Sequence, residues 1–141
     1  MPKIHVVRLM SWNPFKTKKP KPEQIICTEF ANQVRALTLD DRLLGIWTHV
    51  PNEIGWSPNK IAQMLYAAAK AMGMIVGTSD YLFIGPNGGL ALEAKSKSGT
   101  QHPGQKDFQK WCEDQGVPYE VFRSAEEGVE ILKKYNFIKE R

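Results

Sequence analysis

The sequence predicts a single α/β domain in which a mixed β-sheet is flanked by helices. Segments with apolar residues at helical spacing alternate with short segments rich in β-branched and aromatic residues. The resulting order is α-β-α-β-β-α-β-α, with a two-strand unit at its centre. The chain has 141 residues, of which 42% are hydrophobic, which suits one domain with a buried core.

The first predicted helix spans roughly Pro22 to Leu39, because a proline is favourable at the first helical position and apolar residues recur at helical spacing. Its apolar stripe is Ile26, Phe30, Val34 and Leu37. The β-rich segment 45–50 predicts the first strand, and 51–56 a loop.

The second predicted helix has Ser57 as its N-cap and Pro58 at the first helical position, and Gly73 follows its end. The alanine run 67–69 is expected to let this helix approach the sheet closely. We expect its buried stripe to be Ile61, Leu65, Ala69 and Met72.

The central two-strand unit consists of residues 81–85 and 90–95, joined by the turn 86–89. A polar loop follows, and a third helix is predicted over 104–115. Its expected inward residues are Phe108, Trp111 and Cys112.

The last two elements are a strand over 119–123 and a helix opened by the capping box Ser124-x-x-Glu127. The apolar face of this helix is Val129, Leu132 and Tyr135.

Basic residues concentrate at the start of the chain. Residues 1–24 hold six basic groups and one acid, whereas the whole chain has a net charge of +4. We expect residues 1–24 to form an arm and 25–141 to form the domain. Two interpretations of the arm remain open, namely contact with the phosphate backbone of DNA and a disordered, solubilising leader.

The sequence gives no sign of export or membrane insertion. No apolar run reaches the ~20 residues of a membrane helix, and the start lacks a secretory signal pattern. Cys27 and Cys112 are far apart and lie in helix-like contexts, so we expect them to be reduced. The expectation is a cytoplasmic protein with no membrane partner.

Chemically active side chains are concentrated around the central two-strand unit. Glu93 and Lys95 point to the same face because side chains alternate along a strand, and Asp80 opens the partner strand. Two carboxylates suit Mg²⁺ or Mn²⁺, and a neighbouring lysine can orient an attacking water. This set therefore indicates metal-assisted phosphodiester hydrolysis. The alternative is that Glu93 and Lys95 form the solvated face of a hairpin.

Four segments in this order resemble the virus-type replication-repair nuclease (VRR-NUC) family of the PD-(D/E)xK nuclease superfamily. The resemblance covers roughly residues 25–135. In two places the chain departs from the family pattern: Ser79 stands where a proline is usual, and the later helix begins His102-Pro-Gly rather than Ser-Pro. The four segments are 28–33, 48–53, 70–80 with its Gly77-Thr-Ser-Asp80 end, and 92–105 with its Leu-Glu-Ala-Lys95 start.

The resemblance implies a role for each site residue. Asp80 and Glu93 would be metal ligands, together with the main-chain carbonyl of Ala94, and Lys95 would position the water or stabilise charge on the phosphate. Glu29 would hold a metal-bound water or a second metal, and Gln105 would contact the site. The alternative for both Glu29 and Gln105 is a helix residue that faces water.

DNA contacts are expected from a second group of residues, each with an alternative. Three lysines would contact phosphates, namely Lys70, Lys97 and Lys106. The alternative for Lys70 is a favourable charge at a helix C-terminus. The alternative for Lys97 and Lys106 is solvated surface charge. His49 and Asn52 would support the site or the DNA, or else belong to ordinary loop and strand-end packing.

The function implied is a Mg²⁺-dependent, structure-specific DNA endonuclease, with Mn²⁺ as a substitute metal. Short members of the family look viral and tend to form two-fold dimers, so a phage-type homodimer that resolves four-way junctions is expected. Flap- or nick-directed cutting, restriction-like cutting and a non-catalytic DNA-binding module on the same fold remain alternatives.

Overall fold

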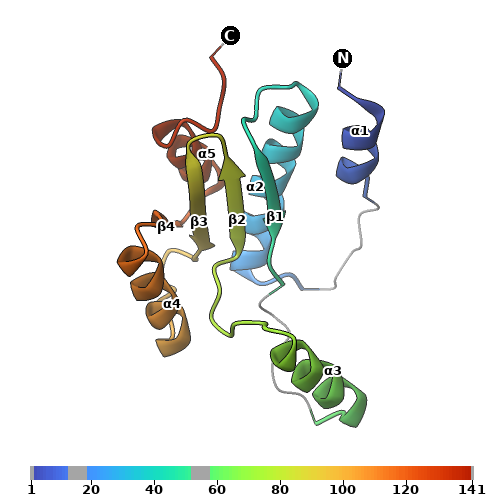
Figure 1. Ribbon diagram of the computed structural model, residues 1–141, viewed down its shortest axis with the longest axis vertical. Coiled ribbons are helices and arrows are strands. Elements are labelled where there is room, and N and C mark those ends of the chain that lie inside the picture. Colours follow the sequence, from blue (N-terminus) through green and yellow to red (C-terminus); the bar gives the residue numbers. More distant parts are fainter. Residues whose placement is uncertain (1, 13–18, 52–57, 141) are drawn as a thin grey trace.

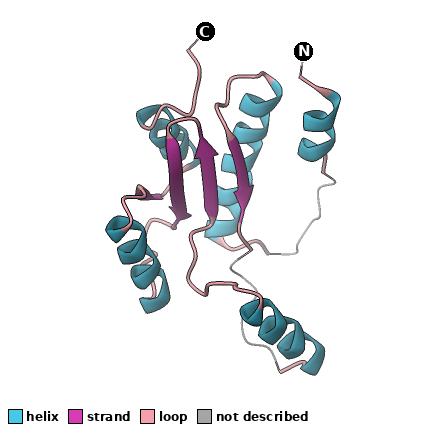
Figure 2. Ribbon diagram, viewed as in Figure 1, coloured by secondary structure: helices cyan, strands magenta, loops and turns pink. Residues whose placement is uncertain are grey.

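A four-stranded mixed sheet forms the centre of the protein (Figures 1 and 2). The computed structural model describes residues 2–12, 19–51 and 58–140. The predicted α/β class and the predicted order of elements are confirmed, with one additional helix inside the expected arm. The elements are α1 (Ile4–Met10), α2 (Pro22–Leu39), β1 (Ile46–His49), α3 (Lys60–Ala71), β2 (Tyr81–Gly85), β3 (Gly88–Ala94), α4 (Pro103–Asp114), β4 (Tyr119–Phe122) and α5 (Ala125–Lys134).

The strand order is β1-β2-β3-β4, in which the first two pairings are antiparallel and β3 pairs with β4 in parallel. The turn between β2 and β3 is tighter than predicted, since only Pro86 and Asn87 separate the strands. Gly88 has a φ of 121°, a conformation that favours glycine. The turn sets the register so that Tyr81 lies opposite Leu92.

One face of the sheet is covered by α2 and α5, and the main core lies there. The ring of Phe30, from α2, lies 5.0 Å from that of Tyr81 and 4.6 Å from that of Phe122. Gly128 allows α5 to pack against Phe30, because a Cβ at this position would be 2.7 Å from the Phe30 ring. The helices predicted over 22–39 and after Ser124 are confirmed as α2 and α5. The Ser124 hydroxyl caps α5 by accepting from the Glu127 N–H at 3.1 Å.

The other face of the sheet is covered only in part. Helix α4 packs against β3 and β4 through a smaller core that contains Cys112 and the partly buried Phe108. Trp111 was expected to point inward but is 52% exposed, because it lies at the margin of this core. The β1–β2 half of the same face is left open, with Ile46 68% and Ile84 60% exposed.

Helix α3 contradicts two expectations. It begins at Lys60, and its N-cap is Asn59, whose side chain accepts from the N–H groups of Ile61 and Ala62; Ser57 lies outside the described residues. The helix extends away from the sheet in Figure 1 and packs extensively on no other described element. The predicted buried stripe is therefore open to solvent, with Ile61 69%, Leu65 66% and Met72 84% exposed and Ala69 only partly buried.

The two ends of the chain both pack beside α2 and the segment that follows it. Phe137 and Ile138 are buried, and the backbone of Phe137 accepts from the Leu44 N–H at 2.8 Å. Near the start of the chain, the guanidinium of Arg35 on α2 lies 4.6 Å from the centre of the Trp12 ring. Helix α1 has no buried residue, and the proposed division at residue 24 stays a prediction.

Candidate functional site

The two predicted carboxylates meet at one end of the β2–β3 hairpin. Asp80 immediately precedes β2 and Glu93 lies near the end of β3, so the antiparallel pairing brings them together. The Asp80 Oδ2 accepts a hydrogen bond from the Ala94 N–H at 2.8 Å. Both side chains are buried, with exposures of 8% for Asp80 and 1% for Glu93. This burial contradicts the alternative of a solvated hairpin face.

Burial places the two carboxyl groups under electrostatic strain. The pKa of Glu93 is raised to about 9, first by burial and then by its hydrogen bond with Asp80 and the Asp80 charge; the Lys95 ammonium and the Tyr119 hydroxyl oppose this shift. Burial and the neighbouring Asp80 charge therefore favour the protonated form of Glu93 when no metal is bound. A divalent cation would remove the need for that proton.

The donor set fits Mg²⁺ in type and number. Mg²⁺ is usually held by one or two carboxylates while water and substrate phosphate complete its octahedral shell. Within residues 2–12, 19–51 and 58–140, no third Asp, Glu, His or Cys side chain joins the pair to form a metal-binding group. The side chains present that could hold the ion are Asp80 and Glu93, and the role of the Ala94 carbonyl stays a prediction of the family resemblance.

Gln105 connects Lys95 to Glu93. The Lys95 Nζ donates to the Gln105 Oε1 at 2.8 Å, and the Gln105 Nε2 donates to the Glu93 Oε1 at 3.1 Å. The same Gln105 oxygen accepts from the His102 N–H at 3.2 Å, which fixes the amide orientation. Gln105 is 5% and Lys95 3% exposed, so the alternative of a solvated helix residue is wrong for Gln105.

The acid on α2 that approaches this network is Glu23 rather than Glu29. The Glu23 Oε1 lies 3.9 Å from the Lys95 Nζ. Glu29 is exposed and forms no hydrogen bond or ion pair with a described residue. The two acids are six positions apart, which turns the helix by about 240°, so the two side chains leave α2 in different directions.

The sequence contained a signal for Glu23 that the motif comparison missed. Glu23 lies four residues before Cys27 and seven before Phe30, so it extends the apolar stripe of α2 by one turn. An acid in line with the apolar stripe of a helix is unusual, and Glu23 is such an acid. Glu29, which the motif indicated, is exposed. The role predicted for Glu29 stays a prediction.

Tyr119 is a neighbour of the site that no motif or spacing in the sequence predicted. Its hydroxyl donates to the Glu93 Oε2 at 3.3 Å and accepts from the Gln101 Nε2 at 3.1 Å. Burial and the Glu93 charge raise the pKa of this phenol, which keeps it a hydrogen-bond donor. The two oxygens of Glu93 are thus held separately, one by Gln105 and the other by Tyr119.

The loop after β3 is held in place from β4. The guanidinium of Arg123 donates to the carbonyl oxygens of Ser96 at 2.5 Å and Gly99 at 3.0 Å. Gly77 has a φ of 91°, and a Cβ there would lie 2.4 Å from the Gly104 carbonyl. The start of α4, which carries Gln105, therefore packs directly on the segment that leads to Asp80.

The residues predicted to contact DNA lie at different distances from the network. Lys106 and Lys97 are exposed and lie next to it, the first beside Gln105 and the second two residues after Lys95. Lys70 is on α3, where its ammonium lies 5.6 Å from the centre of the Tyr66 ring. His49 is partly buried, with its ring 5.1 Å from that of Tyr81. Asn52 lies outside the described residues.

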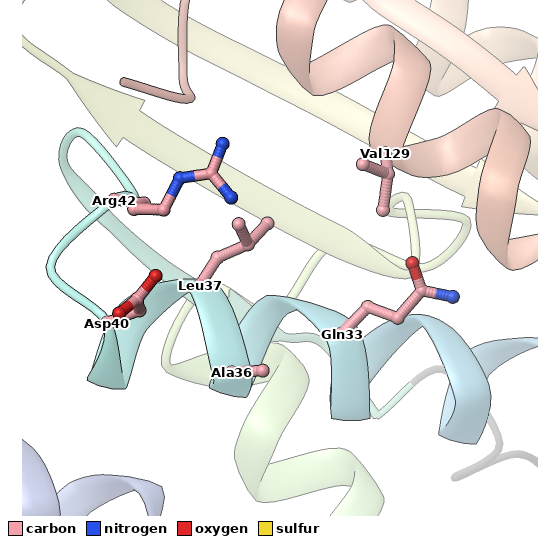
Figure 3. Close-up of a pocket in the computed structure, with 6 residues that line it drawn as sticks. All are labelled: Gln33, Ala36, Leu37, Asp40, Arg42 and Val129. Atoms are coloured by element: carbon pink, nitrogen blue, oxygen red, sulfur yellow. The ribbon is translucent and has the colours of Figure 1, made fainter. Parts of the chain in front are cut away.

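A separate hollow lies between α2 and α5 (Figure 3). It has a volume of about 270 Å³ and contains none of the residues of the carboxylate network. It is lined by Gln33, Ala36, Leu37, Asp40, Arg42 and Val129. No element of it repeats the pairing of carboxylates with a buried lysine, so the candidate site is the network around Glu93.

Comparisons with known proteins support the fold. No family model and no curated protein sequence matches the chain. A solved structure described as "VRR_NUC domain protein" superposes with a TM-score of 0.61 and 19% sequence identity, over 86% of this chain and 93% of that one. No helix among the described residues is long and apolar enough to cross a membrane. The chain therefore has the mixed α/β fold of a VRR_NUC domain.

Proposed function

We propose that the protein is a metal-dependent DNA endonuclease of the VRR-NUC family. The observation that carries the proposal is the bridge in which Gln105 joins the Lys95 ammonium to the Glu93 carboxyl group. A buried lysine, two buried acids and an amide that orients them have a clear use in phosphodiester hydrolysis. A protein that only binds DNA has no need to bury these groups, and burial of charge is costly.

Each protein group has a distinct part in this mechanism. Asp80, Glu93 and the Ala94 carbonyl would hold Mg²⁺ or Mn²⁺, which when bound makes a phosphodiester and a nearby water more reactive. Lys95 orients the attacking water or stabilises negative charge that develops on the phosphate. Gln105 keeps the lysine beside the carboxylates, so that the reacting groups are already in place when DNA arrives.

The geometry favours Glu23 as the acid contributed by α2. Its carboxylate is near Lys95, which allows it to influence the charge and orientation of that lysine. Glu29 retains the role implied by the family pattern only if DNA or metal binding moves α2. Tyr119 holds the second oxygen of Glu93 and is proposed as a positioning residue.

The proposed substrate is branched DNA, with the four-way junction first. Exposed Lys97 and Lys106 flank the site in the sequence and supply phosphate contacts, and Lys70 on α3 extends the basic surface. A homodimer would present two sites to the two symmetric strands of a junction. A phage-encoded role in replication, recombination or repair follows from the resemblance to stand-alone members.

Cleavage assays test the proposal directly. A four-way junction, a flap, a nicked duplex and a linear duplex are incubated with Mg²⁺, Mn²⁺ or EDTA. We expect paired junction cuts that require metal and disappear in Asp80→Asn. The matched control is Asp107→Asn, which makes the same change at an exposed acid on α4 and should cut normally.

The other outcomes separate the alternatives. Cutting of the flap or nicked duplex alone keeps the nuclease and rejects junction resolution. Sequence-dependent cuts in linear duplex favour a restriction-like enzyme. Tight DNA binding without cleavage of any substrate rejects the enzyme in favour of a binding module.

A further inference from the structure

Two apolar surfaces are left uncovered by the described residues of the chain. The first, the α3 stripe, consists of Ile61, Met64, Leu65 and Met72, which are 66–84% exposed. The second, the open sheet face, consists of Ile46 on β1, Ile84 on β2 and Trp111 on α4, which are 52–68% exposed. A domain of this class normally covers both sheet faces with helices.

The open sheet face has the shape of a docking groove. A hollow of about 280 Å³ runs between α4 and the sheet, and it is lined almost entirely by apolar side chains. Leu82 and Ile84 form one wall and Phe108 and Trp111 the other, and among the described residues that line it Gln115 is the only one with a polar side chain. Such a groove suits an apolar helix and offers no charged group to a polar ligand.

Helix α3 has the complementary properties. Its twelve residues contain no acid; Lys70 is about 180° around the helix from Ile61, and Lys60 is the first helical residue, at the edge of the stripe. In the sequence α3 lies between β1, which ends at His49, and β2, which begins at Tyr81; these two residues pair at one end of the sheet, and Ile84 lies toward the other end of β2. Figure 1 shows α3 away from the sheet. The helix therefore points away from the groove of its own chain.

We infer that α3 of one copy docks into the groove of a second copy, and that the second copy returns its own α3. Because each chain has one helix without a sheet and one sheet face without a helix, a two-fold pair satisfies both surfaces at once. Stable specific interfaces bury roughly 1,200–2,000 Å² in total. Each docking would cover seven large apolar residues that are 52–84% exposed, and the two-fold pair contains two such dockings.

This arrangement rests on the dimer in the proposed function and gives it an interface. It also connects the interface to the site, since residues 72–79 lead directly from α3 to Asp80. Thr78 and Ser79 in this connection are already buried. Docking of α3 would fix the far end of the segment that carries a proposed metal ligand.

The test is the mass of the full chain in solution, measured by light scattering and sedimentation across a wide concentration range. We expect a dimer for the wild-type protein. Leu65→Glu on α3 and Ile84→Lys on the sheet each place a charge in the apolar interface and should weaken dimerisation by about a hundredfold or more. Both residues are exposed in the monomer, so circular dichroism and melting should show intact folding.

Two controls identify the surfaces involved. Gln63→Glu adds the same charge on the side of α3 opposite the stripe and should leave the dimer intact. A mixture of the Leu65→Glu and Ile84→Lys chains should form heterodimers, visible by native mass spectrometry. In that heterodimer one docking is entirely native, and the other places Glu opposite Lys.

Three results would overturn the inference. They are a monomeric wild-type protein, a dimer that survives Ile84→Lys, and a Leu65→Glu plus Ile84→Lys mixture that forms no heterodimer. Failure of the proposed function looks different: an inactive dimer with these mutational effects keeps the interface and rejects the nuclease. A monomer that cuts DNA keeps the nuclease and rejects the interface.

Discussion

Replacement of Gln105 by methionine tests the centre of the proposed site. Methionine keeps the length of the side chain and removes both polar atoms. Lys95 loses its 2.8 Å acceptor and, among the described residues, keeps Glu23 at 3.9 Å, while Glu93 loses its 3.1 Å donor. Because these groups are buried, each unsatisfied partner costs about 1–3 kcal/mol, and we expect the free energy of unfolding to fall by about 2–4 kcal/mol.

Two assays read out this change. For a chain of this size, about 2–4 kcal/mol corresponds to a melting temperature lower by roughly 6–12 °C. Cleavage should fall by about a hundredfold or more, since Lys95 is no longer held beside the carboxylates. Gln109→Met, one turn later on α4, makes the same change where the amide contacts Gln101 and Glu113, and should have a much smaller effect on both.

A double-mutant cycle with Lys95→Met sharpens the result. If Gln105 acts through Lys95, the double variant should cut DNA no more slowly than Lys95→Met alone. Additive losses would mean that Gln105 works independently of the lysine. A Gln105→Met protein that melts and cuts like Gln109→Met would refute the bridge as the organising feature of the site.

Four further predictions concern Glu93, the α2 acid and the core. The pKa of Glu93 is raised from 4.5 to about 9, so between these values the metal-free folded protein holds a proton that the unfolded chain releases. Its stability in EDTA should therefore fall as pH rises toward 9, and Glu93→Gln should flatten this slope in thermal melts. For the same reason Mn²⁺ affinity, followed by calorimetry, should rise about tenfold per pH unit below pH 9 in the wild-type protein. Glu23→Gln should slow cleavage more than Glu29→Gln, and equal rates would remove the preference for Glu23. Gly128→Ala pushes a methyl group against the Phe30 ring, 2.7 Å away, and should cost about 1–3 kcal/mol in urea unfolding; an unchanged midpoint would contradict this packing.

Local signals in the sequence were sufficient for most elements of the fold. The periodicity of α2, the capping box of α5 and the turn before Gly88 each act within a few residues, so they can be read without knowledge of the tertiary structure. The pairing of Asp80 with Glu93 was also predictable, because a tight hairpin leaves little freedom in register. These signals explain why the α/β class and the carboxylate pair were predicted.

The sequence motif could not show which acid of α2 approaches Lys95, because this depends on the direction in which each face of the helix points. A motif fixes the spacing of residues along the chain, whereas contact with Lys95 depends on the rotation of α2 about its axis. That rotation is set by the packing of Phe30 against Tyr81 and Phe122, and it turns Glu23 toward the site. Tyr119 was missed for a related reason, because β4 joins β3 only through a parallel, long-range pairing.

The sequence by itself determined most of the elements, the mixed sheet class and the carboxylate pair with its lysine, because these depend on periodicity, capping and residue type. The tertiary structure decided which of those residues meet, namely Gln105 with Lys95 and Glu93. It also decided that the apolar stripe of α3 has no sheet beneath it. An amphipathic sequence predicts that one face of a helix is buried. Only the tertiary structure shows whether the sheet of the same chain buries that face.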